Sequence, residues 1–516
     1  MEKFVARHQP IVTGVLSGFD RLVFRGTLPL FRQHRGMHIF LGRAEVAWVD
    51  WKKFMLATSE RLKTAVLAEV ERARRPIRYL SSPKTSKEDL ARDILAERPL
   101  SKPGVVCAFT AVEPCMSFEY HRSKDPKARG LTLRPRKCQH IYKYYVHPTF
   151  GFMHARIQTW FPFDVQIYMN GREWLARDLR GHRSGFKQAD NCFTWLANPT
   201  LAQRLMDQQL ETEWPKELTA VARRLNPLHD EIFEPCPIDY YWSGYQTEWA
   251  TDVVFENPKA LDGIYPALVR YGIDVFKSAD VFRFLGRKAH GCFTGDLTTR
   301  FKNRPEGTRI KSWSRGNSIK MYNKAGSVLR VETTIARADE FKVLRPRHDA
   351  PDGKLVWQPM RKGVADLHRR AQVSQAANAR YLDALSVVDA STPCSKIFDD
   401  VSRPVTVDGR RFRAMRLGDR DELALLDAIC RGEFAINGLR NRDLRRLLYA
   451  PPSTKLDERR LSGRLSRLLR LLRAHGIIRK IPKTHRYLLT ERGRLLTATL
   501  RATRDASVQQ LLREAA

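Results

Sequence analysis

The stretch 308–343 reads TRIKSWSRGNSIKMYNKAGSVLRVETTIARADEFKV and has the alternation of paired β-strands. Apolar and β-branched residues recur along two segments of it, namely Ile310, Trp313, Ile319 and Met321 in the first and Val328, Leu329, Val331, Thr333 and Ile335 in the second. Between these segments, residues 323–326 (Asn-Lys-Ala-Gly) are typical of a tight turn. The sequence therefore predicts a β-hairpin, and we expect the rest of a sheet to be built around it.

Polar residues interrupt both predicted strands of this hairpin. They are Lys320, Tyr322, Lys324, Arg330 and Glu332. A carboxylate in the middle of a strand, with cations and a phenol nearby, could hold a metal ion or a phosphate. A surface hairpin with a charged outer face explains the same pattern, and spacing alone does not separate the two interpretations.

The run IKMYNKAGSVLRVETTI resembles the paired strands of rolling-circle replication initiators of small plasmids and filamentous phages. In that family a Tyr-Asn/Asp-Lys strand precedes an Arg-x-Glu strand, in a sheet that binds a divalent metal. An earlier strand carries an aspartate, and the segment EWATDVVFENP has Asp252 in the matching place. The resemblance covers about residues 245–345. It implies DNA nicking with Mg²⁺ or Mn²⁺ held by Asp252 and Glu332. Lys320 and Lys324 would counter the negative charge that develops during cleavage, and Tyr322 is a further candidate catalytic residue.

The sequence departs from the family at the catalytic tyrosine. The family's nucleophile follows the Arg-x-Glu strand closely, but this neighbourhood holds Phe341 and no tyrosine. The substitute that the sequence offers is Tyr381, on the predicted helix GVADLHRRAQVSQAANARYLDAL. A tyrosine that only packs its ring is the ordinary alternative, so the resemblance implies metal binding more directly than tyrosine-linked strand transfer.

The charge of the chain indicates a polyanionic partner. The formal net charge is +35, from 91 lysines and arginines against 56 aspartates and glutamates. Such a field attracts nucleic acid, and arginine favours bidentate contacts with phosphate. We expect DNA as the partner, with RNA as the alternative, and the sequence leaves the oligomeric state open.

A membrane partner is not expected from the sequence. It shows no basic amphipathic anchor, no lipidation signal and no apolar window of about 18 residues. The first residues, MEKFVARHQPIVTGVL, lack the layout of a signal peptide, so we expect a cytoplasmic protein.

The cysteines do not form a recognisable metal or disulfide pattern. They are Cys107, Cys115, Cys138, Cys192, Cys236, Cys292, Cys394 and Cys430. None forms a C-x-x-C pair, which argues against a zinc ribbon, and a disulfide framework is not expected in a cytosolic chain of this length. We therefore predict that most of them are small buried hydrophobic residues.

A second candidate metal site lies near the N-terminus. Residues 11–30 form an apolar run with one acid, Asp20, in its middle. The run could be two strands joined at Ser17-Gly18, or the first strand of an RNase H-like nuclease or transposase. Glu113, at the end of the apolar run GVVCAFTAVEPC, is the carboxylate that could join Asp20 in a two-metal site. Buried or turn-capping acids are the ordinary alternative.

The order of predicted elements indicates several domains. Residues 1–236 read as an α/β domain with a long helix over 45–75, a basic loop over 122–143 and then an aromatic hairpin. His154 in that hairpin is a candidate metal ligand, but Arg156 stands where a second histidine would be.

Three further regions follow this N-terminal domain. Residues 237–350 have the β-α-β-β order of a ferredoxin-like half, with a helix expected over 257–276. Residues 351–418 read as a helix and a linker, and residues 419–516 as a separate domain. We expect an α/β (α+β) multidomain protein, with a ferredoxin-like mixed sheet and a C-terminal winged-helix domain.

The last hundred residues resemble a winged helix. The run SRLLRLLRAHGIIRK predicts a long helix that enters a strand, and THRYLLTERG completes a basic two-stranded wing. Leucines at helical spacing would face the core, namely Leu461, Leu465, Leu468, Leu469 and Leu472. The predicted nucleic-acid contacts lie on the other face and in the wing, and they are Arg460, Arg464, Arg467, Arg470, Lys483 and Arg486.

Three functions are consistent with these patterns. The first is a nucleic-acid-binding protein of a mobile element that nicks DNA or initiates replication with a divalent metal. The second is a non-catalytic DNA- or RNA-binding regulator or architectural factor. The third is an RNase H-like nuclease or transposase that uses Asp20 and Glu113.

Overall fold

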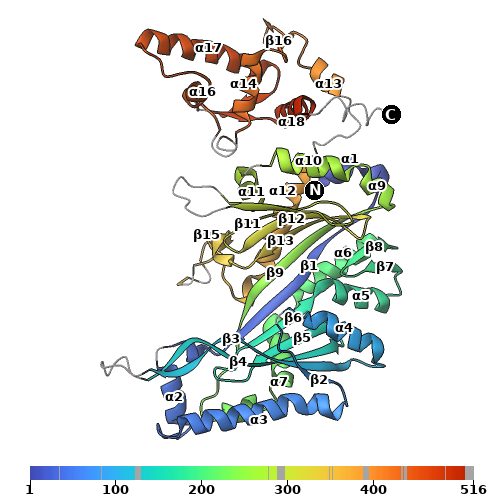
Figure 1. The fold of residues 1–516 in the computed structure, drawn as a ribbon, viewed down its shortest axis with the longest axis vertical. Helices are drawn as coiled ribbons and strands as arrows, with labels where there is room; N and C mark the ends of the chain where they lie inside the picture. The colour runs from blue at the N-terminus through green and yellow to red at the C-terminus, as the bar shows by residue number, and fades with distance from the viewer. Residues whose placement is uncertain are drawn as a thin grey trace. The chain divides into compact units, whose positions relative to one another are not determined.

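The computed structural model describes residues 1–33, 35–82, 84–121, 130–276, 278–287, 297–347, 349–350, 353–386, 394–431, 434, 438–482 and 484–505. It has the mixed α/β architecture that the sequence predicts, with many helices and one large mixed sheet of eleven strands (Figure 1). In spatial order the strands are β10 (Thr298–Lys302), β11 (Arg309–Ser314), β12 (Asn317–Lys324), β13 (Val328–Ile335), β9 (Tyr241–Phe255), β1 (Val12–Thr27), β6 (Val165–Asn170), β5 (Gly151–Gln158), β4 (Gly130–His147), β3 (Gly104–His121) and β2 (Ile77–Tyr79). The sheet is mixed, because β2 runs parallel to β3 whereas β3 to β6 form an antiparallel meander.

Each half of the sheet is a meander that returns to a long central strand. Strands β3, β4, β5 and β6 lie side by side, and β6 pairs with β1. Strands β10 to β13 likewise lie side by side, and β13 neighbours β9. The centre of the sheet is therefore formed by β13, β9, β1 and β6. These strands are largely buried, so a charged side chain in the middle of one of them is removed from bulk water.

Residue contacts divide the chain into two units. The first unit comprises Met1–Thr13, Val253–Thr333 and Ala376–Ala516, and the second comprises Gly14–Asp252 and Thr334–Gln375. The helices of the second unit are α2 (Gly36–Arg43), α3 (Trp51–Arg72), α4 (Lys87–Glu97), α5 (Gly171–Gly181), α6 (Pro199–Gln208), α7 (Trp214–Leu225) and α8 (His229–Ile232). This unit also contains two small hairpins, β7 (Phe186–Ala189) with β8 (Cys192–Leu196) and β14 (Lys342–Arg345) with β15 (Val356–Pro359).

The second unit contains the predicted β-α-β arrangement. Its helix α4 begins after Ser86, whose side chain accepts a hydrogen bond from the backbone N–H of Asp89. Such a cap satisfies one of the free N–H groups at a helix start. The apolar run 11–30 forms the single strand β1 and not two strands joined at Ser17-Gly18.

The prediction of a basic loop over 122–143 is wrong for residues 130–143. Residues 130–143 belong to β4, which pairs with β3 from Gly130 opposite His121 to Val146 opposite Gly104. Its many basic residues concealed the strand, because half of a two-sided strand can be polar without losing its pairing. Residues 122–129 lie outside the described part of the chain.

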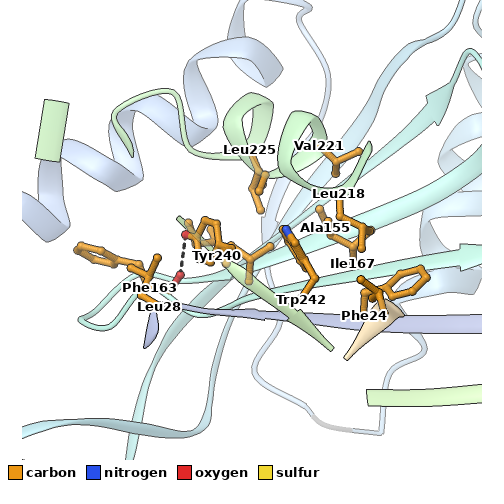
Figure 2. Close-up of a cluster of buried hydrophobic side chains, with 14 of the residues drawn as sticks. Phe24, Leu28, Ala155, Phe163, Ile167, Leu218, Val221, Leu225, Tyr240 and Trp242 are labelled. Carbon is orange, nitrogen blue, oxygen red and sulfur yellow. Dashed lines mark hydrogen bonds between the residues drawn. The ribbon is translucent and has the colours of Figure 1, made fainter. Parts of the chain in front are cut away.

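The core of the second unit lies between the sheet and helices α3 and α7. Figure 2 shows Phe24, Ala155 and Ile167 of three strands beneath Leu218 and Val221 of α7. At one side of this cluster, the Tyr240 hydroxyl donates a hydrogen bond to the backbone oxygen of Phe163 at 3.0 Å (Figure 2). Removing such apolar area from water is the main force that holds the strands in place.

The first unit begins with α1 (Glu2–Arg7) and continues after β9 with α9 (Pro258–Asp262), α10 (Tyr265–Asp274) and α11 (Ser278–Phe284). The single helix predicted over 257–276 is thus interrupted at Gly263 and Ile264. Helix α12 (Leu367–Leu385) follows the sheet and passes from the second unit into the first.

The hairpin predicted over 308–343 contains three strands instead of two. Arg315 and Gly316 both have positive φ angles, 49° and 85°, and they form a tight turn between β11 and β12. The predicted turn between β12 and β13 is present, since Ala325 and Gly326 have φ angles of 55° and 82°. Consecutive left-handed residues match the twist of a two-residue hairpin loop.

The C-terminal segment of the first unit has its own hydrophobic core. Its elements are α13 (Cys394–Asp399), β16 (Val405–Val407), β17 (Arg410–Phe412), α14 (Arg420–Ile429), α16 (Asn441–Leu448), α17 (Lys455–Ala474), β18 (Ile478–Lys480), β19 (Tyr487–Leu489) and α18 (Glu491–Asp505). On α17 the core residues Leu465, Leu469 and Leu472 are fully buried, as their spacing predicts. Among the helices of the described residues, none is long and apolar enough to cross a membrane.

Candidate functional site

Three buried carboxylates meet at the centre of the sheet. They are Asp20 on β1, Glu248 on β9 and Glu332 on β13, and one oxygen atom of each lies within 4.8 Å of the others. Their residues are only 3%, 9% and 1% exposed. Carboxylates at such separations repel one another unless cations or hydrogen-bond donors compensate their charge.

Asp20 is held by two amide side chains. The Nδ2 atom of Asn170 donates to Asp20 Oδ1 at 3.1 Å, and the Nδ2 atom of Asn191 donates to Oδ2 at 2.5 Å. Asn170 is also the N-cap of α5, where its Oδ1 atom accepts from the backbone N–H groups of Arg172 and Glu173. The start of a helix therefore fixes the position of one carboxylate.

Glu248 has both a polar and a charged neighbour. Gln246 Nε2 donates to Glu248 Oε1 at 3.0 Å, and Arg21 Nη1 lies 3.9 Å from the same oxygen. Burial by itself would lower the pKa of Arg21, but the charge of Glu248 and the contact with Tyr168 raise this pKa above its usual value. Arg21 thus stays protonated and offsets part of the negative charge.

Glu332 is bound by the two polar residues that the sequence places beside it. Lys320 Nζ lies 2.5 Å from Glu332 Oε1, and the Tyr322 hydroxyl donates to Oε2 at 3.1 Å. The Lys320 ammonium also lies 5.4 Å from the centre of the Tyr322 ring. The structure therefore brings Lys320, Tyr322 and Glu332 together on the adjacent strands β12 and β13.

The three carboxylates suit a hard divalent cation. Mg²⁺ and Mn²⁺ prefer oxygen ligands, and two oxygens bound to one Mg²⁺ lie at most about 4.2 Å apart, twice the metal–oxygen distance. Oxygen atoms within 4.8 Å of one another are close enough for one cation to be bound between them once the carboxylates move toward it. Neighbouring amides orient Asp20, as expected for groups that support metal ligands.

Asp252, the other ligand implied by the sequence resemblance, has a different environment. Its Oδ2 atom lies 3.2 Å from Nη2 of Arg172, and both side chains are almost completely buried. Arg172 Nη2 also donates to the backbone oxygen of Ala250 at 3.0 Å. Asp252 is not one of the three carboxylates that converge, and Glu248, four residues earlier on β9, is.

Glu113 is likewise not among the carboxylates that gather with Asp20. It accepts a hydrogen bond from the Tyr142 hydroxyl at 2.6 Å, and Lys87 and Arg156 each form an ion pair with it at 3.1 Å. Burial pushes the pKa of Glu113 upward, but these donors and cations together lower it. The pairing of Asp20 with Glu113 that an RNase H-like site requires is therefore not found.

His154 lies in an aromatic stack. Its ring is 4.9 Å from that of Tyr168 with an interplanar angle of 11°, and it is 4.7 Å from the ring of Tyr144. Burial, and after it the charge of Arg156, lowers the pKa of His154 from 6.5 to about 3. A neutral imidazole enclosed by phenol rings is suited to packing, and the structure gives no carboxylate beside it among the described residues.

The low pKa of His154 predicts a loss of stability in acid. Between about pH 6.5 and pH 3 the unfolded chain binds a proton at this residue that the folded chain excludes, so stability should fall as the pH decreases through this window. His154→Phe should flatten this part of the stability curve, measured by thermal melting at each pH. The control is His182→Phe at an exposed histidine, and an equal effect of the two substitutions would contradict the assignment.

Tyr381 is packed in an aromatic cluster of the first unit. Its ring lies 5.0 Å from Phe276 and 5.1 Å from Phe284, both edge-on. Burial raises the pKa of the Tyr381 hydroxyl well above its usual value. Among the described residues this hydroxyl has no hydrogen-bond partner, so no neighbouring base activates it as a nucleophile.

The predicted DNA-binding arginines of α17 lie on the outer face of that helix. Arg460, Arg464, Arg467 and Arg470 are all exposed. Arg464 forms an ion pair with Asp421 at 2.5 Å, whereas neither Arg467 nor Arg470 pairs with an acid among the described residues. Arg486 precedes β19, and Lys483 lies outside the described residues.

Sequence reasoning missed Glu248 and assigned Asp20 to another partner. Both residues are acids within long apolar strands, which was the available signal. The strand order β13-β9-β1 in the sheet decides which carboxylates lie close together. Strands β1 and β13 are more than 200 residues apart in the sequence. No protein-family model, curated protein or solved structure matches this chain.

Proposed function

We propose that this chain is a nucleic-acid-binding protein of a mobile element that nicks DNA with the help of a divalent metal ion. The observation that carries the proposal is the convergence of Asp20, Glu248 and Glu332 inside a chain with a net charge of +35. Buried acids are costly unless they are compensated, and a cation-binding role explains their clustering. A strongly basic protein is suited to bring a phosphodiester to such a site.

In this proposal the three carboxylates hold Mg²⁺ or Mn²⁺. A bound divalent cation polarises a phosphoryl oxygen and lowers the pKa of a water molecule, which supplies a nucleophile at neutral pH. Lys320 adds positive charge where negative charge develops during phosphodiester cleavage. Tyr322 orients Glu332 through its hydroxyl. Because Tyr381 is buried without an activating base, we propose hydrolytic nicking and not a tyrosine-linked intermediate.

The C-terminal segment supports the DNA-binding half of the proposal. Helix α14 is followed by an isolated bridge between Leu439 and Tyr487, then by α16, α17 and the strands β18 and β19. We interpret this order of helix, short strand, two helices and a two-stranded wing as a winged helix. Its α17 would be the recognition helix, with Arg467 and Arg470 directed to DNA.

The isolated C-terminal segment should fold and bind duplex DNA. Its core includes Val401 and Met415, and the His475 ring is hydrogen-bonded to the backbone oxygen of Arg413 at 2.8 Å. We therefore expect the fragment 394–505 to melt cooperatively and to shift duplex DNA in a gel. The shorter fragment 418–505 lacks these contacts and should melt at a lower temperature. DNA binding only by the full-length protein would contradict the winged-helix assignment.

A non-catalytic binding protein is the second candidate, and one observation favours it. Lys320, Arg21 and two asparagine amides already compensate the three acids to some degree. A network of this kind could be purely structural, because buried ion pairs occur without any metal. Incubation of supercoiled and single-stranded DNA with the protein and Mn²⁺ separates the candidates, since only the enzyme produces nicks.

A further inference from the structure

Two cysteines face each other across the hairpin of β3 and β4. Cys115 lies opposite Arg136 and Cys138 lies opposite Glu113, so the cysteines are diagonal neighbours on the same face of the sheet. Their Sγ atoms are 3.1 Å apart. Both side chains are half-buried, whereas Cys107, Cys192 and Cys236 are fully buried and Cys394 is exposed. Cys292 lies outside the described residues.

The surroundings of the pair favour a thiolate on Cys115. The hydrogen bond between the two sulfurs, aided by Ser117 and by the charge of Arg156, lowers the pKa of Cys115 to about 7, although burial opposes this effect. The same hydrogen bond and burial raise the pKa of Cys138. Near neutral pH the thiolate form, which is the nucleophile in thiol chemistry, is therefore accessible at Cys115.

We propose that Cys115 and Cys138 form a reversible intrachain disulfide that covalently joins β3 to β4 under oxidising conditions. The geometry carries this proposal, because the sulfurs need to approach by only about 1 Å to reach bonding distance. The cysteine pair shares no residue with the carboxylate site. The disulfide proposal can therefore be tested independently of the proposed nicking activity.

The oxidant we assign is a low-molecular-weight disulfide. The Cys115 thiolate attacks one sulfur of this disulfide, and the other sulfur leaves as a thiolate. The Cys138 thiol gives its proton to that leaving thiolate, and its sulfur then attacks Cys115 and displaces the second small thiolate, which takes a proton from water. Two cysteines lose two electrons in total, and the small disulfide gains them as two thiols.

The new bond would stabilise the hairpin and fix its outer part. It would close a loop between residues separated by 23 positions, which reduces the freedom of the unfolded chain. It would also lie next to Glu113 and its partners Tyr142 and Arg156 on the same sheet face. We expect the oxidised protein to melt at a higher temperature than the reduced protein.

The test treats the native full-length protein at pH 7 with oxidised glutathione, blocks the remaining thiols by alkylation, and maps peptides by mass spectrometry without reduction. We expect a peptide pair joined through Cys115 and Cys138, and alkylation of both residues again after treatment with dithiothreitol. Before oxidation, Cys115 should be alkylated at least about 10-fold faster than Cys107, whose pKa burial raises to about 12. Full alkylation of both cysteines after the oxidant, or their linkage to other cysteines, would overturn the proposal.

Variants separate the two sulfurs and control for exposure. Cys138→Ser should accumulate a mixed disulfide with glutathione on Cys115, and Cys115→Ser should leave Cys138 reduced. Cys394→Ser, at an exposed cysteine, should leave the linkage of Cys115 to Cys138 unchanged. If a serine variant of the pair fails to fold, peptide mapping of the unmodified chain still decides, because it needs no substitution. Equal glutathione modification of Cys115 and Cys394 without a crosslink would contradict the proposed switch.

Discussion

Raising the salt concentration from about 50 to 200 mM should weaken binding to duplex DNA by roughly 10³-fold or more. Arginine and lysine release condensed counterions when they contact phosphates, and the logarithm of affinity falls with the logarithm of salt with a slope of about −0.9 per phosphate contacted. In the proposed complex the exposed arginines of α17 and the basic residues of the wing would provide several such contacts. A titration of labelled duplex at a series of salt concentrations measures the slope, and a flat profile would contradict nucleic-acid binding altogether.

Substitution of Arg467 and Arg470 by alanine should reduce both the affinity and the salt dependence. Each lost phosphate contact should make the slope less steep by about 0.9. Melting temperature should stay close to that of the parent, because both side chains are exposed and neither forms an ion pair among the described residues. The control replaces Arg72 and Arg183, exposed arginines of the second unit, and changes net charge by the same amount. Equal loss of affinity in both double variants would mean that α17 has no special role.

Addition of Mn²⁺ should raise the melting temperature of the protein. A ligand that binds only the folded state stabilises it by mass action, by about 2.7 kcal/mol when its concentration is 100 times the Kd. The carboxylates Asp20, Glu248 and Glu332 provide the expected ligands. Mg²⁺ should act in the same direction, and a melting curve with a series of metal concentrations measures the effect. No shift with either metal would contradict the metal site.

Matched substitutions distinguish the observed carboxylates from those that the sequence resemblance implies. Asp20→Asn keeps an oxygen that can accept from Asn170 or Asn191 but removes one negative charge, so it should abolish most of the metal-induced shift. Asp252→Asn should retain the shift, since Asp252 is bound to Arg172 and is not one of the three converging acids. The shift is measured within each variant, so that a lower baseline stability does not affect the comparison. A shift lost with Asp252→Asn and kept with Asp20→Asn would restore the original assignment.

Glu332→Gln is a less suitable test of the metal site. Relief of repulsion between two acids predicts a more stable metal-free protein. Glu332 is however paired with Lys320, which is itself mostly buried, and removing one partner of such a pair leaves an uncompensated charge. We therefore expect Glu332→Gln to lower the melting temperature while it also weakens the response to metal.

Local patterns predicted much of the secondary structure. The leucine spacing of α17 and the turn chemistry at residues 323–326 correspond to the structure because both depend on neighbours in sequence. The run SRGN also contains residues typical of a turn, at Arg315 and Gly316. This turn was not predicted, because the apolar alternation continues on both sides of it and reads as one strand. Strand β4 was missed since its basic residues resemble a loop until its pairing with β3 is known.

The candidate site depended on information that the sequence does not contain locally. Lys320, Tyr322 and Glu332 could be associated in advance, because adjacent strands carry them within a few residues of each other. The sequence alone could not show that Asp252 pairs with Arg172 and not with a metal ion, because Arg172 lies in the first turn of a helix 80 residues earlier. The meeting of Asp20 with Glu248 follows from long-range strand order, which single-sequence periodicity does not specify.

The most direct test of the proposed function is the conversion of supercoiled plasmid to nicked circles by the purified protein. We expect nicked circles with Mn²⁺ and none with EDTA. We expect Asp20→Asn to slow nicking by at least about 100-fold, because the loss of a group that only supports a metal ligand already costs about 10- to 100-fold and Asp20 is a proposed ligand. The variant with Arg467 and Arg470 replaced by alanine should nick more slowly than the parent only at salt concentrations that weaken its binding to DNA. The contradicting result is a protein that binds the plasmid tightly but leaves it supercoiled with Mn²⁺, or an Asp20→Asn variant that nicks as fast as the parent.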